Sequence, residues 1–441
     1  MKLLFSFIII FFLNNCSFDN KTGIWKNEKN SKARENSSFK DFEPVGLSRE
    51  NLLKNIPIKK NFSFKKFKSF INYDWKDIDY DGSNNLKNFK YNENFNLIFK
   101  SKKISRNNLD KSFLYKNDNV ILTDEKGNII SFSIGKNKVV SKYNFYKKKF
   151  KNVKIKLNII LDNDIIYVSD NLGFLYAYNQ KLNKIIWAKK YEVAFRSNIK
   201  IYNNKLITSN QNNNLIFFNK QNGEILNKIP TEETIIKNKF KNNLSIINEY
   251  TFFINTFGSL YAVNNDSMRI IWFINLNETI DLNPKNLFLG SKIISYKDKL
   301  CISSKKFTYI IDQKTGSVIH KKNFSTELKP TLIEDYFFAI TKNKYLVALN
   351  TINGEIIYSY NLNEKIAKFL NTKKKNAFFK DLIILNNKIF ILLENSYILI
   401  FNKIGNLEEI KKLPTKINSS MSVIENSLLY IDKKNRLSLL D

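Results

Sequence analysis

Short apolar runs separated by turns rich in glycine and asparagine recur along most of the chain, most clearly at Asp164–Trp187. Each copy reads as strand, tight turn, strand, turn and strand, and a repeat of this kind decides the whole fold. Eight copies follow one another at intervals of 38 to 52 residues, about 44 on average. The residues that close their first turns are Gly127, Gly173, Asn213, Gly258, Lys306, Lys344, Ser396 and Asn435. Glycine and asparagine tolerate positive φ best, so these positions predict β-turns, with Lys306 and Lys344 as departures.

The second turn of each copy is marked in the same way. Six positions after the first closing residue the copies carry Ser133, Asn179, Asn219, Asn264, Asp312, Asn350, Asn402 and Asp441. Ten positions after it seven copies carry Asn137, Asn183, Gly223, Met268, Gly316, Gly354 and Asn406. An Asn or Asp side chain can bond its own backbone two residues on and so start a turn. The strand between the two turns is apolar on both faces, as at Phe174–Tyr178, which is typical of a strand covered on both sides.

Four strands in each repeat, arranged radially, predict an all-β fold, a β-propeller with four-stranded antiparallel blades. An open solenoid is the alternative for such a repeat. The last copy starts at Asn435 and stops at Asp441, before an outer strand. A lone strand at Phe95–Lys100 precedes the first copy and can complete that blade, which closes the ring and removes its open sheet edges. The prediction is then eight blades, or seven if the copy at Lys306 or Ser396 is an insertion.

The start of the chain resembles a bacterial export signal. Leu3–Leu13 is an apolar run that is too short to span a bilayer. Leu13 stands three residues before Cys16, as in the lipobox of bacterial lipoproteins, although Asn15 departs from that pattern. We expect a signal peptide over residues 1–15 and lipidation of Cys16, with an ordinary secretory peptide as the alternative. By resemblance to lipoprotein sorting rules, Ser17 after the cysteine implies the periplasmic face of the outer membrane.

Residues 16–92 lack the repeat and are dense in Lys, Asn and Ser, which predicts a flexible tether ahead of a propeller over residues 93–441. Four phenylalanines in this segment are candidates to dock on another surface: Phe62, Phe64, Phe67 and Phe70. Asp77, Asp79 and Asp81 open a calcium-loop pattern, with oxygen ligands at alternate positions. The place of the closing glutamate holds Asn88, so we favour a solvated acidic loop over a metal site.

Charge and rare residue types point to no chemistry. The formal net charge is +32, but the lysines are spread through every loop. This spread favours coding bias over a nucleic-acid-binding site as the reason for the charge. The functional alternative is weak adhesion to anionic lipid. Once Cys16 carries lipid, Cys301 has no disulfide partner and is expected to be a small buried side chain. His320 falls where Trp187 and Trp272 stand in other copies, so we expect it to be structural. We also find no phosphate loop, nucleophile elbow or metal-spaced His/Cys cluster, and therefore predict no catalysis and no cofactor.

The copies resemble the PQQ-like propeller repeat. Gly173–Asn179 and Gly258–Asn264 match its first half, Lys314–Gly316 matches its second turn, and Trp187 and Trp272 match its docking tryptophan. Two functional classes share this repeat. Quinoprotein dehydrogenases hold PQQ and Ca²⁺ on the propeller axis, whereas the BamB-type lipoprotein belongs to the outer-membrane β-barrel assembly machinery. The length, the lipobox pattern and the missing catalytic motifs resemble the second class.

This resemblance implies a non-catalytic scaffold that binds the periplasmic POTRA domains of the barrel-forming subunit. In the BamB-type family an interblade loop carries the motif L-x-L-R and contributes to the partner contact, and Val193, Phe195 and Arg196 occupy its two apolar positions and its arginine. An acidic pair of the next loop falls near Lys239 and Lys241, so its charge is reversed. Binding of unfolded outer-membrane proteins at blade edges is a further hypothesis. A quinoprotein-dehydrogenase-like enzyme and a lipid-anchored periplasmic ligand-binding propeller remain the alternatives.

Overall fold

The computed structural model describes residues 54–146, 149–150, 152–233, 243–277, 288 and 290–441, together with two short strands near the N-terminus. These strands, β1 (Ser17–Phe18) and β2 (Trp25–Lys26), pair antiparallel in a unit that spans Met1–Glu50. The expected signal peptide and Cys16 lie outside the described residues. A second unit spans Asn51–Asp441. Of the helices in the described part of the chain, none has the length and apolar character needed to cross a membrane.

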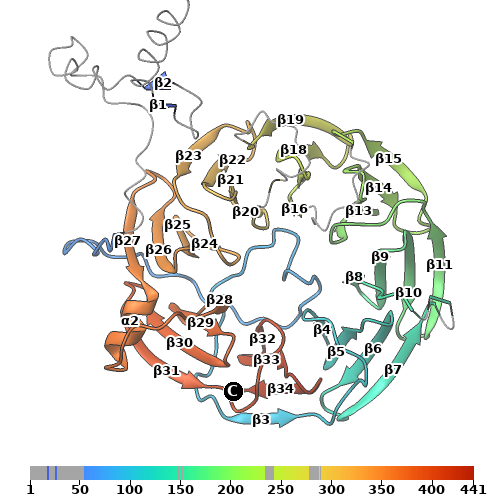
Figure 1. Ribbon diagram of the computed structural model, residues 1–441. Helices are drawn as coiled ribbons and strands as arrows, with labels where there is room; N and C mark the ends of the chain where they lie inside the picture. Colours follow the sequence, from blue (N-terminus) through green and yellow to red (C-terminus); the bar gives the residue numbers. More distant parts are fainter. Residues whose placement is uncertain are drawn as a thin grey trace, which may run out of the picture. The chain divides into compact units, whose positions relative to one another are not determined.

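Within the described residues of the second unit, the strands form eight four-stranded antiparallel sheets arranged as a ring (Figure 1). The inner strands are β4 (Leu114–Lys116), β8 (Leu157–Asp162), β12 (Lys200–Tyr202), β16 (Asn243–Ile247), β20 (Ile294–Tyr296), β24 (Thr331–Ile333), β28 (Phe379–Leu385) and β32 (Ser422–Ile424). The second strands are β5 (Asn119–Thr123), β9 (Ile165–Asp170), β13 (Lys205–Ser209), β17 (Tyr250–Ile254), β21 (Lys299–Ser303), β25 (Tyr336–Ile340), β29 (Lys388–Leu393) and β33 (Ser427–Ile431). The predicted eight-bladed propeller is therefore confirmed.

The third strands are β6 (Asn128–Ser133), β10 (Phe174–Asn179), β14 (Leu215–Asn219), β18 (Ser259–Asn264), β22 (Thr308–Asp312), β26 (Tyr345–Asn350), β30 (Tyr397–Asn402) and β34 (Leu437–Leu440). The outer strands are β7 (Lys138–Asn144), β11 (Lys184–Lys190), β15 (Ile225–Ile229), β19 (Arg269–Asn275), β23 (Val318–Lys322), β27 (Ile356–Asn361), β31 (Leu407–Lys412) and β3 (Leu97–Lys100). The copies at Lys306 and Ser396 form complete blades, so neither is an insertion. The eighth blade is completed by β3, which pairs antiparallel with β34 near the other end of the chain, as predicted.

The core lies between neighbouring blades. The second and third strands are buried on both faces, as the apolar runs predict, and in β10 the four central residues are buried. The outer strands alternate between exposed and partly buried positions, as in β11. Each apolar face therefore packs on the next blade, and the buried side chains form seven clusters around the described part of the ring.

The turn predictions hold at most positions. Seven of the eight residues that close the first turn have positive φ, including Lys344 at 66°, whereas Lys306 does not. In the second turn Met268 takes a positive φ of 53°, and in the seventh blade the positive φ falls on Gly405 instead of the predicted Asn406. Residues other than glycine therefore adopt the left-handed backbone conformation that the turn requires, because the paired strands on either side fix the turn geometry.

The docking positions of the outer strands are also confirmed. The indole N–H of Trp187 donates to the Lys220 carbonyl of the next blade at 3.1 Å, and Trp272 donates to Gln313 at 2.9 Å. His320 occupies the same place in the fifth blade, with Nε2 3.1 Å from the Ile352 carbonyl. This contact makes His320 a structural strand residue.

The longest interval in the repeat, between Lys344 and Ser396, contains helix α2 (Leu362–Phe369), which the sequence pattern did not reveal. The helix connects β27 of the sixth blade to β28 of the seventh. Its N-cap is Asn361, whose side chain accepts from the Glu364 N–H at 3.2 Å. That bond satisfies one of the free N–H groups of the first turn.

Candidate functional site

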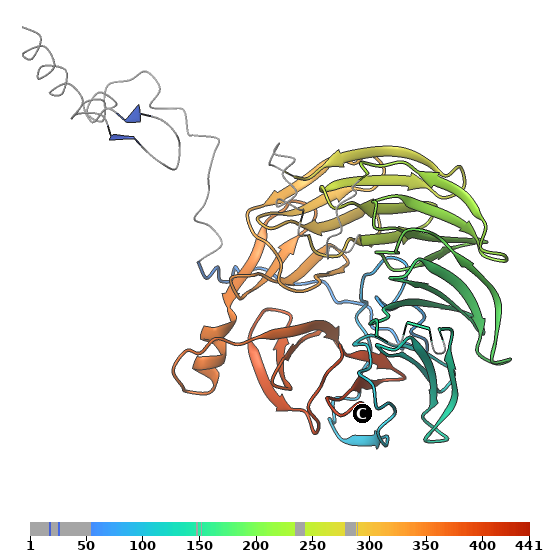
Figure 2. The same cartoon turned by 45° about the vertical axis from the view of Figure 1, so that its right-hand side comes forward.

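Residues 70–92, here called the axial segment, run through the centre of the ring (Figures 1 and 2). This placement differs from the flexible tether expected for residues 16–92. Trp75, Leu86, Phe89 and Tyr91 are buried in the same cluster as the first, seventh and eighth blades. The described part of the expected tether is therefore packed inside the propeller.

The axial segment makes a hydrogen bond to the inner strand of every blade. In chain order of the strands, the pairs are Trp75 N–H to Tyr115 O at 2.8 Å, Leu161 N–H to Lys76 O at 2.9 Å, Lys200 Nζ to Asp81 O at 3.1 Å, Ile246 N–H to Gly82 O at 2.7 Å, Ser295 N–H to Ser83 O at 3.0 Å, Leu332 N–H to Asn85 Oδ1 at 2.9 Å, Phe89 N–H to Ile384 O at 3.1 Å and Asn72 Nδ2 to Val423 O at 2.8 Å. Buried backbone groups require such partners. The segment thus supplies hydrogen-bond partners to the inner strands, which have no further strand beside them on the side of the axis.

The chain reaches the axis by crossing from the outside of the ring. Ile56 pairs with Ser359 in the outer strand β27 through two backbone hydrogen bonds of 2.8 and 2.9 Å. Phe64 and Phe67 are then buried in the cluster formed by the sixth and seventh blades, with Phe62 half-buried beside them. The predicted docking of these phenylalanines is confirmed, and their surface is the propeller itself; Phe70 lies at the edge and is 38% exposed.

A buried pair of charges lies at the centre of the axial segment. Lys200 and Asp77 form an ion pair of 2.7 Å, and the Lys200 side chain is 0% exposed. Its ammonium group also donates to Asn84 Oδ1 at 2.5 Å and to the Asp81 carbonyl. Three oxygen partners match the three N–H bonds of an ammonium group, so a charge that would be costly alone is compensated.

Asp79 faces a second set of cations. It forms an ion pair with Lys292 and accepts from Asn198 Nδ2 at 2.5 Å. Burial alone would raise the pKa of Asp79, but the ammonium groups of Lys292, Lys329 and Lys200 outweigh it and hold that pKa well below its usual range. Burial raises the pKa of Asp77, although Lys200 opposes this. Both carboxylates therefore serve as partners for lysines.

The solvated acidic loop that we favoured for Asp77, Asp79 and Asp81 is wrong, because Asp77 and Asp79 are buried, and their contacts do not fit the calcium alternative either. Asp77 is bound to Lys200, Asp79 to Lys292, and Asp81 accepts from the backbone N–H of Ser83 at 2.9 Å. A calcium site needs six to eight oxygens that converge on one point. In the part of the chain that the structure describes, no three His, Cys, Asp or Glu side chains gather in a way that could hold a metal ion.

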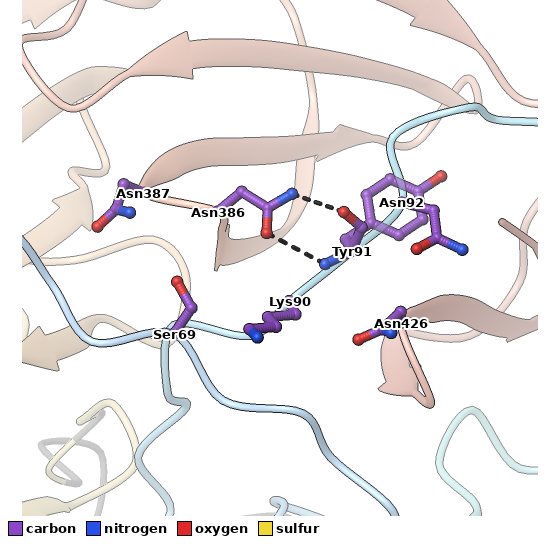
Figure 3. A pocket seen from close by; sticks show the side chains of 7 residues that line it. All are labelled: Ser69, Lys90, Tyr91, Asn92, Asn386, Asn387 and Asn426. Atoms are coloured by element: carbon purple, nitrogen blue, oxygen red, sulfur yellow. Dashed lines mark hydrogen bonds between the residues drawn. The ribbon is translucent and has the colours of Figure 1, made fainter.

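Two hollows lie beside the axial segment. One, of about 340 Å³, is lined by Ser69, Lys90, Tyr91, Asn92, Asn386, Asn387 and Asn426 (Figure 3). Asn386 binds the backbone of Tyr91 twice, accepting from its N–H at 3.2 Å and donating to its carbonyl at 2.6 Å. The other hollow has a volume of about 410 Å³. Two acids in its wall form ion pairs, Asp74 with Lys76 at 2.8 Å and Asp162 with Lys220 at 2.9 Å. In the first wall Asn386 therefore holds the segment, whereas the pair of Asp162 and Lys220 in the second joins two blades.

The predicted partner-binding residues lie in the loop between β11 and β12, residues 191–199, here called the Arg196 loop. Its backbone is tied to the turns of two blades, since the Phe195 N–H donates to Asp170 O at 3.0 Å and the Arg196 N–H donates to Ser209 O at 2.8 Å. Phe195 is 2% exposed and packs on Tyr191 and Phe218. Phe195, which the resemblance implies as a partner-binding residue, instead faces inward, and its ring anchors the loop from inside.

Arg196 itself is half-buried at the surface of this loop. Its guanidinium donates to Gln211 Oε1 at 3.0 Å, while Nε has no partner among the described residues. Burial lowers the pKa of Arg196, yet the group stays charged at neutral pH. Val193 lies half-buried in the same loop. The unpaired Nε is itself buried, so only the partly exposed remainder of the Arg196 side chain is open to a partner, and a guanidinium suits a carboxylate.

Other residues singled out in the sequence fall in two groups. Cys301 is buried in β21 and is a free thiol, and burial raises its pKa, as expected for an inert core residue. Lys239 and Lys241 lie outside the described residues, so the reversed charge of that loop stays a prediction. Sequence reasoning missed Lys200, the buried cation of the axis. The signal for it was a lysine in an inner strand at a position where the inner strands of the next two blades carry Ser245 and Ile294.

Residues 125–360 match the sequence model of the family described as outer membrane protein assembly factor BamB. This stretch is more than half of the 441-residue chain. The chain belongs to the BamB family. No curated protein sequence matches the chain significantly.

Solved structures share the BamB-family fold at low identity. BamB from Moraxella catarrhalis has a TM-score of 0.61 at 12% identity, covering 78% of this chain and 99% of that chain. Quinohemoprotein alcohol dehydrogenase from Comamonas testosteroni has a TM-score of 0.60 at 9% identity, covering 83% and 80%. The computationally designed Ika8 protein has a TM-score of 0.55 at 8% identity, covering 77% and 99%. These likenesses show the propeller fold alone.

The axis of this BamB-family propeller does not suit the cofactor of the quinoprotein class. The axis, where a resemblance to quinoproteins would place PQQ and Ca²⁺, contains the axial segment, bonded to all eight inner strands. The acids there, Asp77 and Asp79, are bound to Lys200 and Lys292. A carboxylate neutralised by a buried lysine is a poor ligand for a divalent cation, because the cation would have to displace the ammonium group.

Proposed function

We propose that this BamB-family propeller is a non-catalytic scaffold of the outer-membrane β-barrel assembly machinery, which binds the periplasmic POTRA domains of the barrel-forming subunit. Its expected place is the periplasmic face of the outer membrane, held by a lipid on Cys16. The family match supports the assembly role. The observation that supports the non-catalytic part is the axial segment, which runs through the centre of the ring and is bonded to all eight inner strands.

The proposed contact is centred on Arg196. The loop that carries it is fixed by backbone bonds to two blades and by the buried Phe195, so little conformational entropy is lost on binding. Arginine in a partly desolvated position is a frequent hot spot of protein interfaces. Val193 supplies the neighbouring apolar contact, while Phe195 acts from inside by holding the loop.

A pull-down from membranes with tagged full-length protein tests the proposal. Wild type should recover the barrel-forming subunit, and Arg196→Glu should reduce recovery at least tenfold, since a hot-spot loss of about 2 kcal/mol or more weakens binding about thirtyfold. The matched control is Arg269→Glu, the same change at an exposed arginine that begins β19. This variant should recover the subunit as wild type does.

Three outcomes separate the parts of the proposal. Loss in Arg196→Glu alone supports both the scaffold and its contact residue. Equal recovery in all three proteins discards the role of Arg196 and keeps the scaffold. If wild type recovers no barrel subunit, the scaffold proposal is wrong.

A further inference from the structure

Helix α2 and the loop after it form an exposed surface that neither the blades nor the proposed scaffold function uses. We call residues 362–378 the α2 patch. Three of its apolar side chains face solvent: Phe369 is 45% exposed, Leu370 50% and Phe378 64%. On a soluble domain, an exposed apolar group of this kind marks a contact with another surface.

The structure holds these side chains outward. At the base of the patch Leu362 and Asn363 are buried. The Asn363 side chain accepts from the Ala377 N–H at 3.0 Å, and the Phe378 carbonyl accepts from the Glu394 N–H at 2.9 Å. The helix end is closed by the Leu370 N–H, which donates to the Ile366 carbonyl at 3.0 Å. The loop is therefore clamped at both ends, and the exposed side chains belong to an ordered element.

The patch is strongly basic. It contains five lysines, namely Lys365, Lys368, Lys373, Lys374 and Lys375, against one acid, Glu364. Glu364 already binds Lys374 at 2.8 Å and accepts from Asn55 Nδ2 at 2.9 Å. Lysines 373 to 375 are exposed and lie between Leu370 and Phe378 in sequence. Exposed cations and exposed apolar side chains thus follow one another along this segment.

The N-terminal part of the chain enters the propeller beside this patch. Asn55 Oδ1 accepts from the Asn361 N–H at 2.8 Å, at the N-cap of α2, and Asn55 Nδ2 binds Glu364 in the first turn. Residues 1–53, which include the expected lipid site, precede this point. The chain that leads from the expected lipid site therefore joins the propeller next to α2.

We propose that the α2 patch docks on an anionic phospholipid surface. Phe369, Leu370 and Phe378 enter the headgroup region, and the five lysines bind lipid phosphates. Amphipathic segments that combine exposed aromatic or aliphatic residues with lysines bind membranes in this way, and each lysine near an anionic surface adds to the attraction. The contact orients the propeller on the membrane, a role distinct from partner binding at Arg196.

Vesicle flotation with the full chain tests the proposal, using vesicles of phosphatidylcholine with one quarter phosphatidylglycerol, or of phosphatidylcholine alone. Replacing Lys373, Lys374 and Lys375 by Gln should lower the partition coefficient on the anionic vesicles about tenfold or more, and high salt should weaken wild-type binding. The control variant replaces the exposed Lys181, Lys184 and Lys189, in the blade across the ring from α2 (Figure 1), by Gln. It changes net charge equally and should bind as wild type.

A label measures contact directly, whatever the N-terminus contributes. An environment-sensitive dye on Leu370→Cys should shift to the blue on anionic vesicles, whereas the same dye on Leu182→Cys, an exposed position of the second blade, should not. The buried Cys301 does not react, and both variants share Cys16, so the difference reports the position. Equal responses at both positions, or equal binding to neutral vesicles, would overturn the proposal and leave an acidic protein surface as the occupant.

Discussion

The blades and the axial segment are both buried and both held by backbone hydrogen bonds, but their sequences encode these contacts differently. In a blade every strand pairs with neighbours of its own repeat, so apolar runs and turn residues recur along the chain. The axial segment meets the inner strands through different backbone and side-chain atoms from one blade to the next. Its sequence therefore has no period, although it is hydrogen-bonded to every blade.

The blades that form the ring and the segment that occupies its centre therefore have different sequence requirements. Stacked blades need only a repeated pattern, because each apolar face packs on the next. The centre of the ring exposes eight inner strands that require polar partners, and one irregular segment supplies them through asparagines, a glycine and paired charges. A mutation on the axis should therefore cost more than the same mutation on the outer wall.

The strongest test of this comparison is the buried ion pair. Lys200→Ala should destabilise the protein by about 3–5 kcal/mol, because it leaves Asp77 buried without its cation. Lys59→Ala removes a pair of similar length, 2.5 Å from Glu355, in which the lysine is 77% exposed, and should cost less than about 1 kcal/mol. Urea denaturation followed by circular dichroism measures both.

The double variant Asp77→Asn with Lys200→Met sharpens the result. It removes both charges, so it should lower the free energy of unfolding by less than Lys200→Ala alone does. If Lys200→Ala and Lys59→Ala proved equally mild, the axial segment would not be the stabilising element that the structure indicates.

The second test addresses the contact between blades. Gly223 has a φ of 77°, and an added Cβ would lie 2.5 Å from the Trp187 ring. Gly223→Ala should therefore cost about 1–3 kcal/mol, through backbone strain and displacement of the docked indole. Thermal unfolding with Trp fluorescence measures the loss and the changed indole environment together.

Gly135→Ala is the matched control, because Gly135 lies in the corresponding turn of the first blade and no left-handed backbone holds it there. It should change stability by less than about 0.5 kcal/mol. Equal effects at Gly223 and Gly135 would mean that docking of Trp187 does not depend on the turn of the next blade.

The sequence predicts the repeated part of this molecule well. The turn residues from Gly127 to Asn435, the docking positions of Trp187 and His320, and closure by the strand that ends at Lys100 all follow from spacing, because each recurs or completes a recurring unit. Helix α2 was missed because it is a single insertion in one interval of the repeat.

The axial segment could not be predicted in this way. Its Lys, Asn and Ser content is typical of a tether, and the carboxylates of Asp77 and Asp79 resemble a calcium loop, because a sequence shows ligands but not the lysines that the fold brings to them. Phe195 was assigned to the surface for the same reason, since its burial depends on Tyr191 and Phe218 around it. The family resemblance pointed to the Arg196 loop but not to which of its side chains faces outward.

The smallest expected effect is the pH dependence of the axis. The pKa of Asp79 is lower in the folded protein than its unfolded value of about 3.9, so its stabilising contribution is complete above about pH 4 and is lost as the pH falls towards the folded value. The stability difference between wild type and Asp79→Asn should therefore shrink by about 1 kcal/mol between pH 6 and pH 3 in urea denaturation. Asp266→Asn, at a carboxylate that is 61% exposed, should show less than half of this change. If the stability difference between wild type and Asp79→Asn stayed constant with pH, the lysines around Asp79 would not lower its pKa. Ion pairs would then contribute no more to stability at the axis than at the outer wall.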